Sequence, residues 1–138
     1  MDMELKKNYL QTIFQFKSLI NGSLSGKNWK VSFNEFLVMQ GIEQGKSMTE
    51  IREELFVTKA AISQNLASLE KKGYITRETD LENRRQIIVN LTQVGLGVLR
   101  ETGDTFDSGF LNFVEKMGVD DLTQMLEKMN RMIELLGE

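Results

Sequence analysis

The chain has 138 residues, 41% hydrophobic and 27% charged, which is the balance of a globular protein with one hydrophobic core. It contains no cysteine and no histidine, so disulfides, thiolate metal sites and the commonest general base are excluded. We also find no phosphate-binding glycine loop and no nucleophile elbow, and therefore expect no enzyme, no cofactor and no metal site. The apolar runs are too short for a membrane span and no secretory signal is visible, so we expect a cytoplasmic protein with no membrane partner.

Charge is unevenly distributed along the chain. The net charge of −3 argues mildly against nucleic-acid binding. Between Lys46 and Asn90, however, eight Lys and Arg accompany seven Asp and Glu, so this stretch is slightly positive and the remainder is acidic. This bias is too weak to indicate a function by itself.

The N-terminal part predicts a helix and a loop. Apolar residues recur every three or four positions between Met3 and Leu24, which is the pattern of one apolar helical face. The residues on that face are Leu5, Tyr9, Ile13, Phe16 and Ile20. The Gly- and Ser-containing stretch from Asn21 to Lys30 predicts a loop.

Two capping boxes predict the starts of the next two helices. Ser32 with Glu35, and Ser47 with Glu50, have the spacing at which side chains satisfy the free amides of a first turn. The first of these helices should run to Gln44 and stop at Gly45 in a left-handed conformation. The second should be short, with Ile51 and Leu55 facing inward.

A third helix should follow a tight turn at Phe56 and Val57, capped by Thr58, and end at Gly73. Two helices joined by so short a turn form a helix-turn-helix. Strand-forming residues then appear at 74–76 and 87–89, and the polar stretch between them predicts a hairpin with a charged tip at 80–84.

The C-terminal third predicts two more helices. Apolar residues from Leu96 to Val114 fit one long helix, although its glycines weaken that pattern, and Thr92 should cap its start. Gly118 marks a break, after which a strong apolar stripe runs from Leu122 to Leu136. The methionines on this stripe are best interpreted as packing residues.

The third predicted helix has the profile of a helix that enters the major groove of DNA. Ile62, Leu66 and Leu69 share one side, and the opposite side is small and polar. The candidate contact residues on that side and at the cap are Thr58, Lys59, Ala60, Ser63, Gln64 and Lys71. The N-terminal part should read base edges, while Thr58 lies near a phosphate. An ordinary surface helix in solvent shows the same polar face. The turn before this helix and the hairpin after it are therefore needed to distinguish a DNA-binding helix from an ordinary one.

Arg84 and Arg85 lie at the predicted hairpin tip next to Asn83. Paired arginines on a projecting ribbon can enter a narrow minor groove, where the negative potential is deepest. A charged loop in solvent is the alternative, because Asp80 and Glu82 lie beside them.

The stretch from Ser47 to Gly97 resembles the winged helix-turn-helix of the MarR family. The resemblance rests on the sequence segments 57–63 (VTKAAIS), 69–77 (LEKKGYITR), 83–85 (NRR) and 89–95 (VNLTQVG). One position departs from the family pattern, because Asn83 stands where the family usually has Asp in the wing. The resemblance identifies Arg85 as the minor-groove arginine, with Glu82 as a substitute partner for the missing carboxylate.

The resemblance also implies assembly and regulation. It implies a mostly α fold with a small antiparallel β wing, in one domain over residues 1–138. Residues 1–31 and 93–138 would form a helical dimerisation region, and residues 32–92 the DNA-binding lobe. The implied function is a ligand-responsive repressor that binds a pseudo-palindromic double-stranded DNA site as a homodimer. A small aromatic effector is implied, with Phe14, Phe33, Phe36 and Phe106 as candidate cavity residues.

An alternative function stays open at this point. Winged helices also serve as protein-interaction modules that bind no specific DNA, and the acidic net charge of this chain is compatible with that role.

Overall fold

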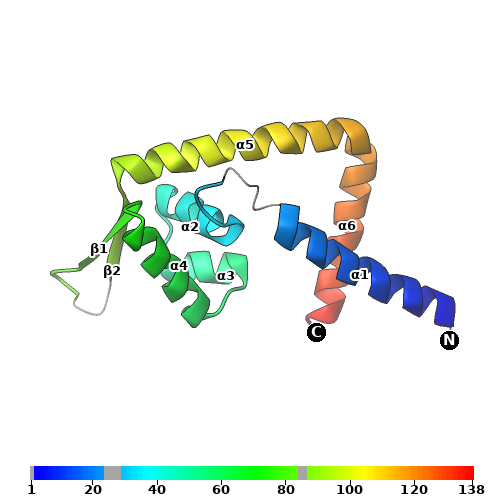
Figure 1. The fold of residues 1–138 in the computed structure, drawn as a ribbon. Coiled ribbons are helices and arrows are strands. Elements are labelled where there is room, and N and C mark those ends of the chain that lie inside the picture. The colour runs from blue at the N-terminus through cyan, green and yellow to red at the C-terminus, as the bar shows by residue number, and fades with distance from the viewer. Residues whose placement is uncertain (1, 24–28, 84–86) are drawn as a thin grey trace. The chain divides into compact units, whose positions relative to one another are not determined.

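A computed structural model describes residues 2–23, 29–83 and 87–138 of the chain. Within these residues the chain forms helices and one two-stranded antiparallel sheet (Figure 1). The elements are α1 Met3–Ser23, α2 Phe33–Glu43, α3 Met48–Leu55, α4 Lys59–Lys71, β1 Ile75–Thr79, β2 Ile87–Leu91, α5 Gln93–Met117 and α6 Val119–Leu136. The predicted fold class, mostly α with a small antiparallel wing, is confirmed.

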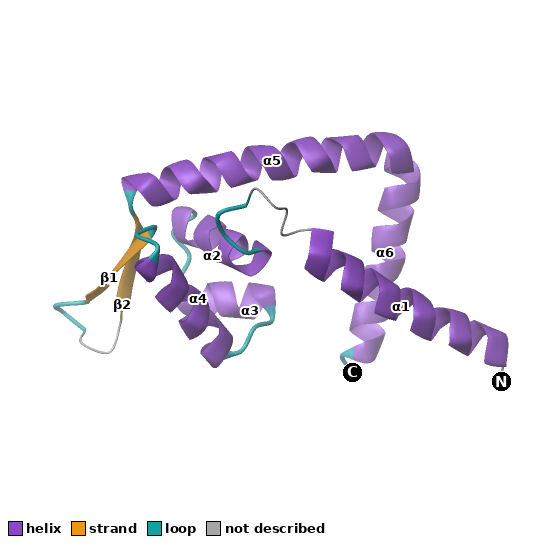
Figure 2. Cartoon of the chain, in the orientation of Figure 1, coloured by secondary structure: helices purple, strands orange, loops and turns teal. Residues whose placement is uncertain are grey.

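The chain divides into two compact units, Met1–Thr102 and Gly103–Glu138. The first unit contains the winged helix-turn-helix, in which α2 contacts α3, α4 and β2, and α4 contacts β1. Figure 2 shows the small sheet in orange beside the C-terminal end of α4. The second unit contains the later part of α5 and all of α6. None of the helices within the described ranges is both long and apolar enough for a bilayer span.

Side chains from most elements of the first unit contribute to its hydrophobic core. The largest fully buried side chains are Phe36, Met39, Ile51, Leu69, Ile75 and Val38. Helix α2 supplies three of them, and Trp29 extends its aromatic side, with the Trp29 and Phe36 rings 5.8 Å apart between centroids. Because α2 lies at the centre of this core, it is the element against which α3 and α4 are positioned.

Both predicted capping boxes form. Ser32 Oγ accepts a hydrogen bond from the Glu35 amide at 3.1 Å, and Glu35 accepts one from the Ser32 amide at 2.8 Å. The pair Ser47 and Glu50 repeats this arrangement at the start of α3. Gly45 has φ +76°, so the left-handed stop after α2 is also confirmed.

The turn between α3 and α4 contains an unexpected backbone conformation. Phe56 adopts left-handed φ +53°, ψ +40°, and 92% of its surface is exposed. Residues with a Cβ rarely adopt left-handed backbone angles, and a position that needs them is normally occupied by glycine. The conformation is what allows α3 to end and α4 to begin within three residues, since the amide of Val57 bonds back to Arg52.

The wing and α1 agree with the predicted elements. The strands pair from Ile75 opposite Leu91 to Thr79 opposite Ile87, so residues 77–79 of the predicted polar stretch belong to β1 and lead up to the expected tip at 80–84. Helix α1 ends at Ser23, within the predicted helix from Met3 to Leu24, and its last residues overlap the stretch from Asn21 for which the sequence predicts a loop.

Candidate nucleic-acid interface

One face of α4 is exposed to solvent and is called the bare face below. Its apolar side is buried against the core, with Ile62 at 5%, Leu66 at 7% and Leu69 at 0% exposure. The opposite side is exposed along its length, and the residues there are Lys59, Ala60, Ser63, Gln64, Ala67 and Lys71. The five predicted contact residues within α4 therefore lie together on one accessible surface of the first unit.

The N-terminal end of α4 favours an anion. The Thr58 hydroxyl oxygen caps the helix by accepting a hydrogen bond from the Ala61 amide at 3.0 Å, as predicted. The first turn contains no acidic residue, and Lys59 adds a positive charge to the positive end of the helix dipole. The Thr58 hydroxyl proton can still be donated to a phosphate oxygen, since its capping bond uses the oxygen as acceptor.

The charge on the bare face is positive because the acid of α4 is paired. Glu70 is the acidic residue in α4, and its carboxylate accepts a 2.9 Å hydrogen bond from the Arg77 guanidinium on β1. This hydrogen bond lowers the pKa of Glu70 and keeps it ionised as half of an ion pair. In the described residues, no hydrogen bond or ion pair engages the side chains of Lys59, Gln64 or Lys71. These side chains are thus available to an incoming ligand.

The wing arginines Arg84 and Arg85 lie outside the described residues. The two strands of the wing are described, and their pairing places the tip of the wing between Thr79 and Ile87. Within the tip, Asp80 accepts a 2.9 Å hydrogen bond from the amide of Glu82, which closes a local turn. The carboxylate of Glu82 remains exposed, so its predicted role beside Arg85 stays a prediction.

Two residues whose contact the sequence did not indicate hold α4 in place. Lys72 ends the helix, and its ammonium group lies 3.1 Å from a carboxylate oxygen of Glu35 on α2. The two residues are 37 positions apart, and neither belongs to a motif that indicates a contact between them. Glu35 is visible in the sequence as a capping residue, but its second partner is not.

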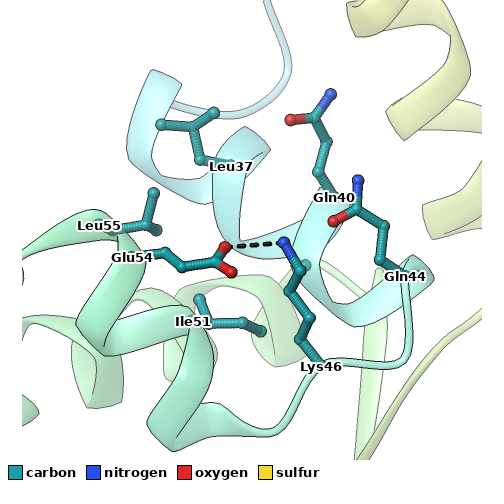
Figure 3. A pocket seen from close by; sticks show the side chains of 8 residues that line it. Leu37, Gln40, Gln44, Lys46, Ile51, Glu54 and Leu55 are labelled. Atoms are coloured by element: carbon teal, nitrogen blue, oxygen red, sulfur yellow. Dashed lines mark hydrogen bonds and ion pairs between the residues drawn. The ribbon is translucent and has the colours of Figure 1, made fainter.

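A shallow groove of about 200 Å³ lies between α2 and α3 (Figure 3). It is lined by Leu37, Gln40, Gly41, Gln44, Lys46, Ile51, Glu54 and Leu55. Lys46 and Glu54 form a 2.7 Å ion pair across it, so the charges at the groove already neutralise each other.

The four aromatic candidates for an effector cavity do not line this groove. Phe36 is 2% exposed within the core, and Phe33 lies beside it with 6.5 Å between ring centroids. Phe14 on α1 is 73% exposed, and Phe106 in the second unit stacks on Phe110. Their role as effector-contacting residues stays a prediction.

A helix-turn-helix with an exposed, basic face on its second helix, followed by a two-stranded wing, defines a winged helix-turn-helix protein. The model of the MarR family matches residues 31–86 of the chain. The chain is 30% identical to the transcriptional regulator HosA of Escherichia coli over 100 residues, which cover 69% of this chain and 74% of HosA. It is 22% identical over 109 residues to the regulator SarZ of Staphylococcus saprophyticus, covering 78% and 73% of the two chains.

Solved structures show the same fold. The regulator BldR from Sulfolobus solfataricus aligns with a TM-score of 0.74 at 24% identity, covering 97% of this chain and 98% of BldR. MepR of S. aureus, solved as a DNA complex, aligns with a TM-score of 0.74 at 18% identity, covering 92% and 96%. The chain belongs to the MarR family of transcriptional regulators, and the prediction that it is not an enzyme agrees with that membership.

Proposed function

We propose that this protein regulates transcription by binding double-stranded DNA sequence-specifically through the bare face of α4. The observation that carries the proposal is the division of α4 into a buried apolar side and an exposed side, on which Lys59, Gln64 and Lys71 have no partner among the described residues. Similar proteins support it, since MepR of S. aureus and a MarR variant of E. coli were both solved with DNA.

The contacts divide by chemistry. Ser63 and Gln64, with Lys59, would read base edges in the major groove, and a Gln amide can bind adenine through two hydrogen bonds. Ala60 is small, so it lets the helix backbone approach the bases. Thr58, at the positive end of the helix, would bind a phosphate.

Basic groups around this helix would fix its register on the duplex. Lys71 at the far end of α4 is exposed and would contact a second phosphate. Arg84 and Arg85 at the tip of the wing would enter the adjacent minor groove, where negative potential attracts arginine.

The functional form would be a homodimer. Residues 1–31 and 93–138 would form its dimerisation region, and residues 32–92 the DNA-binding lobe. Large apolar side chains on both units support this, among them Leu5 at 64% and Phe16 at 43% exposure on α1. In α6, Ile133 is 58% and Leu136 is 69% exposed. A second copy would cover these side chains and present two α4 helices to a pseudo-palindrome.

Repression released by a small aromatic effector is the regulatory mode that we propose for this dimer. A bound repressor blocks access to a promoter, and an effector that binds the DNA-free form better lowers its affinity for the site. We propose the cytoplasm as its place of action.

Selection of bound duplexes from a random pool tests the proposed function. We expect enrichment of a two-fold symmetric site with half-site centres about one helical turn, roughly 34–36 Å, apart. Binding should weaken steeply with salt, because released counterions contribute to it. A chain that enriches no site and binds random duplex without salt dependence would instead be a protein-interaction module.

A further inference from the structure

The C-terminal end of α4 is tied to the N-terminal end of α2 by one lysine. Lys72 Nζ lies 3.1 Å and 3.3 Å from the two carboxylate oxygens of Glu35 and donates a 3.2 Å hydrogen bond to the carbonyl of Lys30. The Glu35 side chain is 7% exposed and that of Lys72 is 36% exposed. The ammonium group thus makes three contacts with the segment that begins α2.

The Glu35 carboxylate accepts hydrogen bonds from the start of its own helix and from the end of α4. The Ser32 amide donates at 2.8 Å, and Lys72 Nζ lies 3.1 Å and 3.3 Å from the two carboxylate oxygens. Burial raises the pKa of Glu35, but hydrogen bonding to Ser32 and Lys72 helps to outweigh burial and leaves the pKa below its ordinary value. Because one ammonium group faces both oxygens, the contact has a preferred geometry and restrains where the end of α4 lies on α2.

The apolar contacts of α4 restrain its orientation less sharply than this ion pair does. Hydrophobic burial of Ile62, Leu66 and Leu69 holds α4 against the core, but the hydrophobic effect is non-directional. Hydrogen bonds and close ion pairs have preferred distances and angles, so they set orientation more sharply. In α4 the directional contacts with α2 are at the C-terminal end, whereas the base-reading residues are at the other end.

The contact between Lys72 and Glu35 is called the anchor below. A small rotation of α4 about this anchor would move the residues that face the DNA by a large distance. Gln64 lies eight residues from Lys72, roughly 12 Å along the helix. A tilt of about 5° at the anchor would move Gln64 by about 1 Å, and a side-chain hydrogen bond tolerates only a few tenths of an ångström. Base-specific contacts are therefore sensitive to the anchor, while phosphate attraction is much less so.

We propose that Lys72 and Glu35 are positioning residues for DNA recognition, whose ion pair sets the orientation of α4 and so its sequence specificity. The proposal rests on the proposed function of α4. It assigns opposite roles to two adjacent lysines, because Lys71 is exposed and unpaired within the described residues and is free to bind phosphate.

The test compares affinities for a selected site and for a random duplex over a range of salt concentrations. The variants are Lys72→Met, Glu35→Gln and Lys72→Arg, with Lys71→Met as the matched control. All are measured at a temperature at which circular dichroism shows each of them folded. Lys72→Met should lower specific affinity about tenfold and leave random-duplex affinity within about twofold, and Glu35→Gln should do the same. Lys72→Arg, which keeps the charge and the donors, should restore most of the specificity.

The control should behave differently. Lys71→Met should weaken both duplexes alike and reduce the slope of log affinity against log salt by about 2, which is about 1 for each subunit of the proposed dimer. If Lys72→Met instead behaves like Lys71→Met, Lys72 is a phosphate contact and the proposal is overturned.

Two further outcomes separate this proposal from the one on which it rests. If the wild-type chain binds the selected site no better than a random duplex, the proposed function is wrong. If the wild-type chain prefers the selected site, and a folded Glu35→Gln variant shows the same preference, only the positioning role of the ion pair is wrong. Glu35→Gln keeps the size and the acceptor oxygen of the side chain, so it decides the matter even if Lys72→Met does not fold.

Discussion

The Thr92 hydroxyl donates a 2.7 Å hydrogen bond to the carbonyl oxygen of Gly73, directly after the end of α4. The Thr92 hydroxyl oxygen in turn accepts a 2.9 Å hydrogen bond from the amide of Gly95 and so caps the first turn of α5. The Thr92 amide also bonds to the carbonyl of Tyr74. One residue therefore joins the end of the candidate recognition helix, the start of the wing and the start of α5.

Replacing Thr92 by Val should destabilise the fold by about 1–2 kcal/mol, because it removes the helix cap and the bond to Gly73 together. Thr92→Ser keeps the hydroxyl and should lose far less. Urea unfolding followed by circular dichroism measures both variants, and equal stability of the two would show that the hydroxyl contributes nothing.

Two glycines of α5 should respond in opposite ways to alanine. A Cβ on Gly95 would lie 2.0 Å from the backbone oxygen of Tyr74, so Gly95→Ala forces α5 away from the wing and should cost about 2 kcal/mol or more. A Cβ on Gly97 would meet nothing within 4 Å, so Gly97→Ala should stabilise the helix by up to about 1 kcal/mol. Thermal unfolding of the two variants provides the comparison, and a shift of the same sign in both would contradict this packing.

The lowered pKa of Glu35 gives stability a dependence on pH. Since the folded pKa lies below the ordinary value of 4.5, the carboxylate stabilises the fold above that value and the contribution is lost as pH falls through the folded pKa. Glu35→Gln should therefore be less stable than the wild type at neutral pH, and the gap should narrow as the pH falls through the folded pKa of Glu35. Chemical unfolding at a series of pH values tests this, and a gap that is constant with pH would refute it.

Arg85→Ala should lower DNA affinity by about tenfold on sites whose flanks have a narrow minor groove, and less on G·C-rich flanks. Arg100 on α5 offers a control, because it is exposed but lies outside the proposed interface. Anisotropy titrations with the two flanking sequences measure the effect. If Arg100→Ala lowers the DNA affinity equally, Arg85 contributes only its positive charge and makes no specific contact with the minor groove.

Local signals in the sequence predicted much of this fold. Ser32 with Glu35, Ser47 with Glu50, and Thr58 each satisfy amides within four residues, so the helix starts could be read from spacing alone. The buried side of α4 followed from its periodicity for the same reason. These features depend on neighbours in the chain and not on the tertiary structure.

The remaining features depend on contacts between distant residues. The left-handed Phe56 was not predictable, because its residue type disfavours the conformation that the turn requires. The extension of β1 to Thr79 depends on pairing with Ile87, and the Lys72 anchor depends on Glu35. No pattern of spacing encodes a partner 37 residues away, so the exposed face of α4 could be predicted but not what orients it.

The most direct measurement of the central proposal combines Gln64→Ala with single base-pair changes in a selected site. The wild-type chain should lose about 1–3 kcal/mol at one position in each half-site, through the bidentate contact of Gln64, and Gln64→Ala should lose discrimination at that position alone. Discrimination that is unchanged at every position in Gln64→Ala would contradict the account, because the bare face of α4 would then not read the bases.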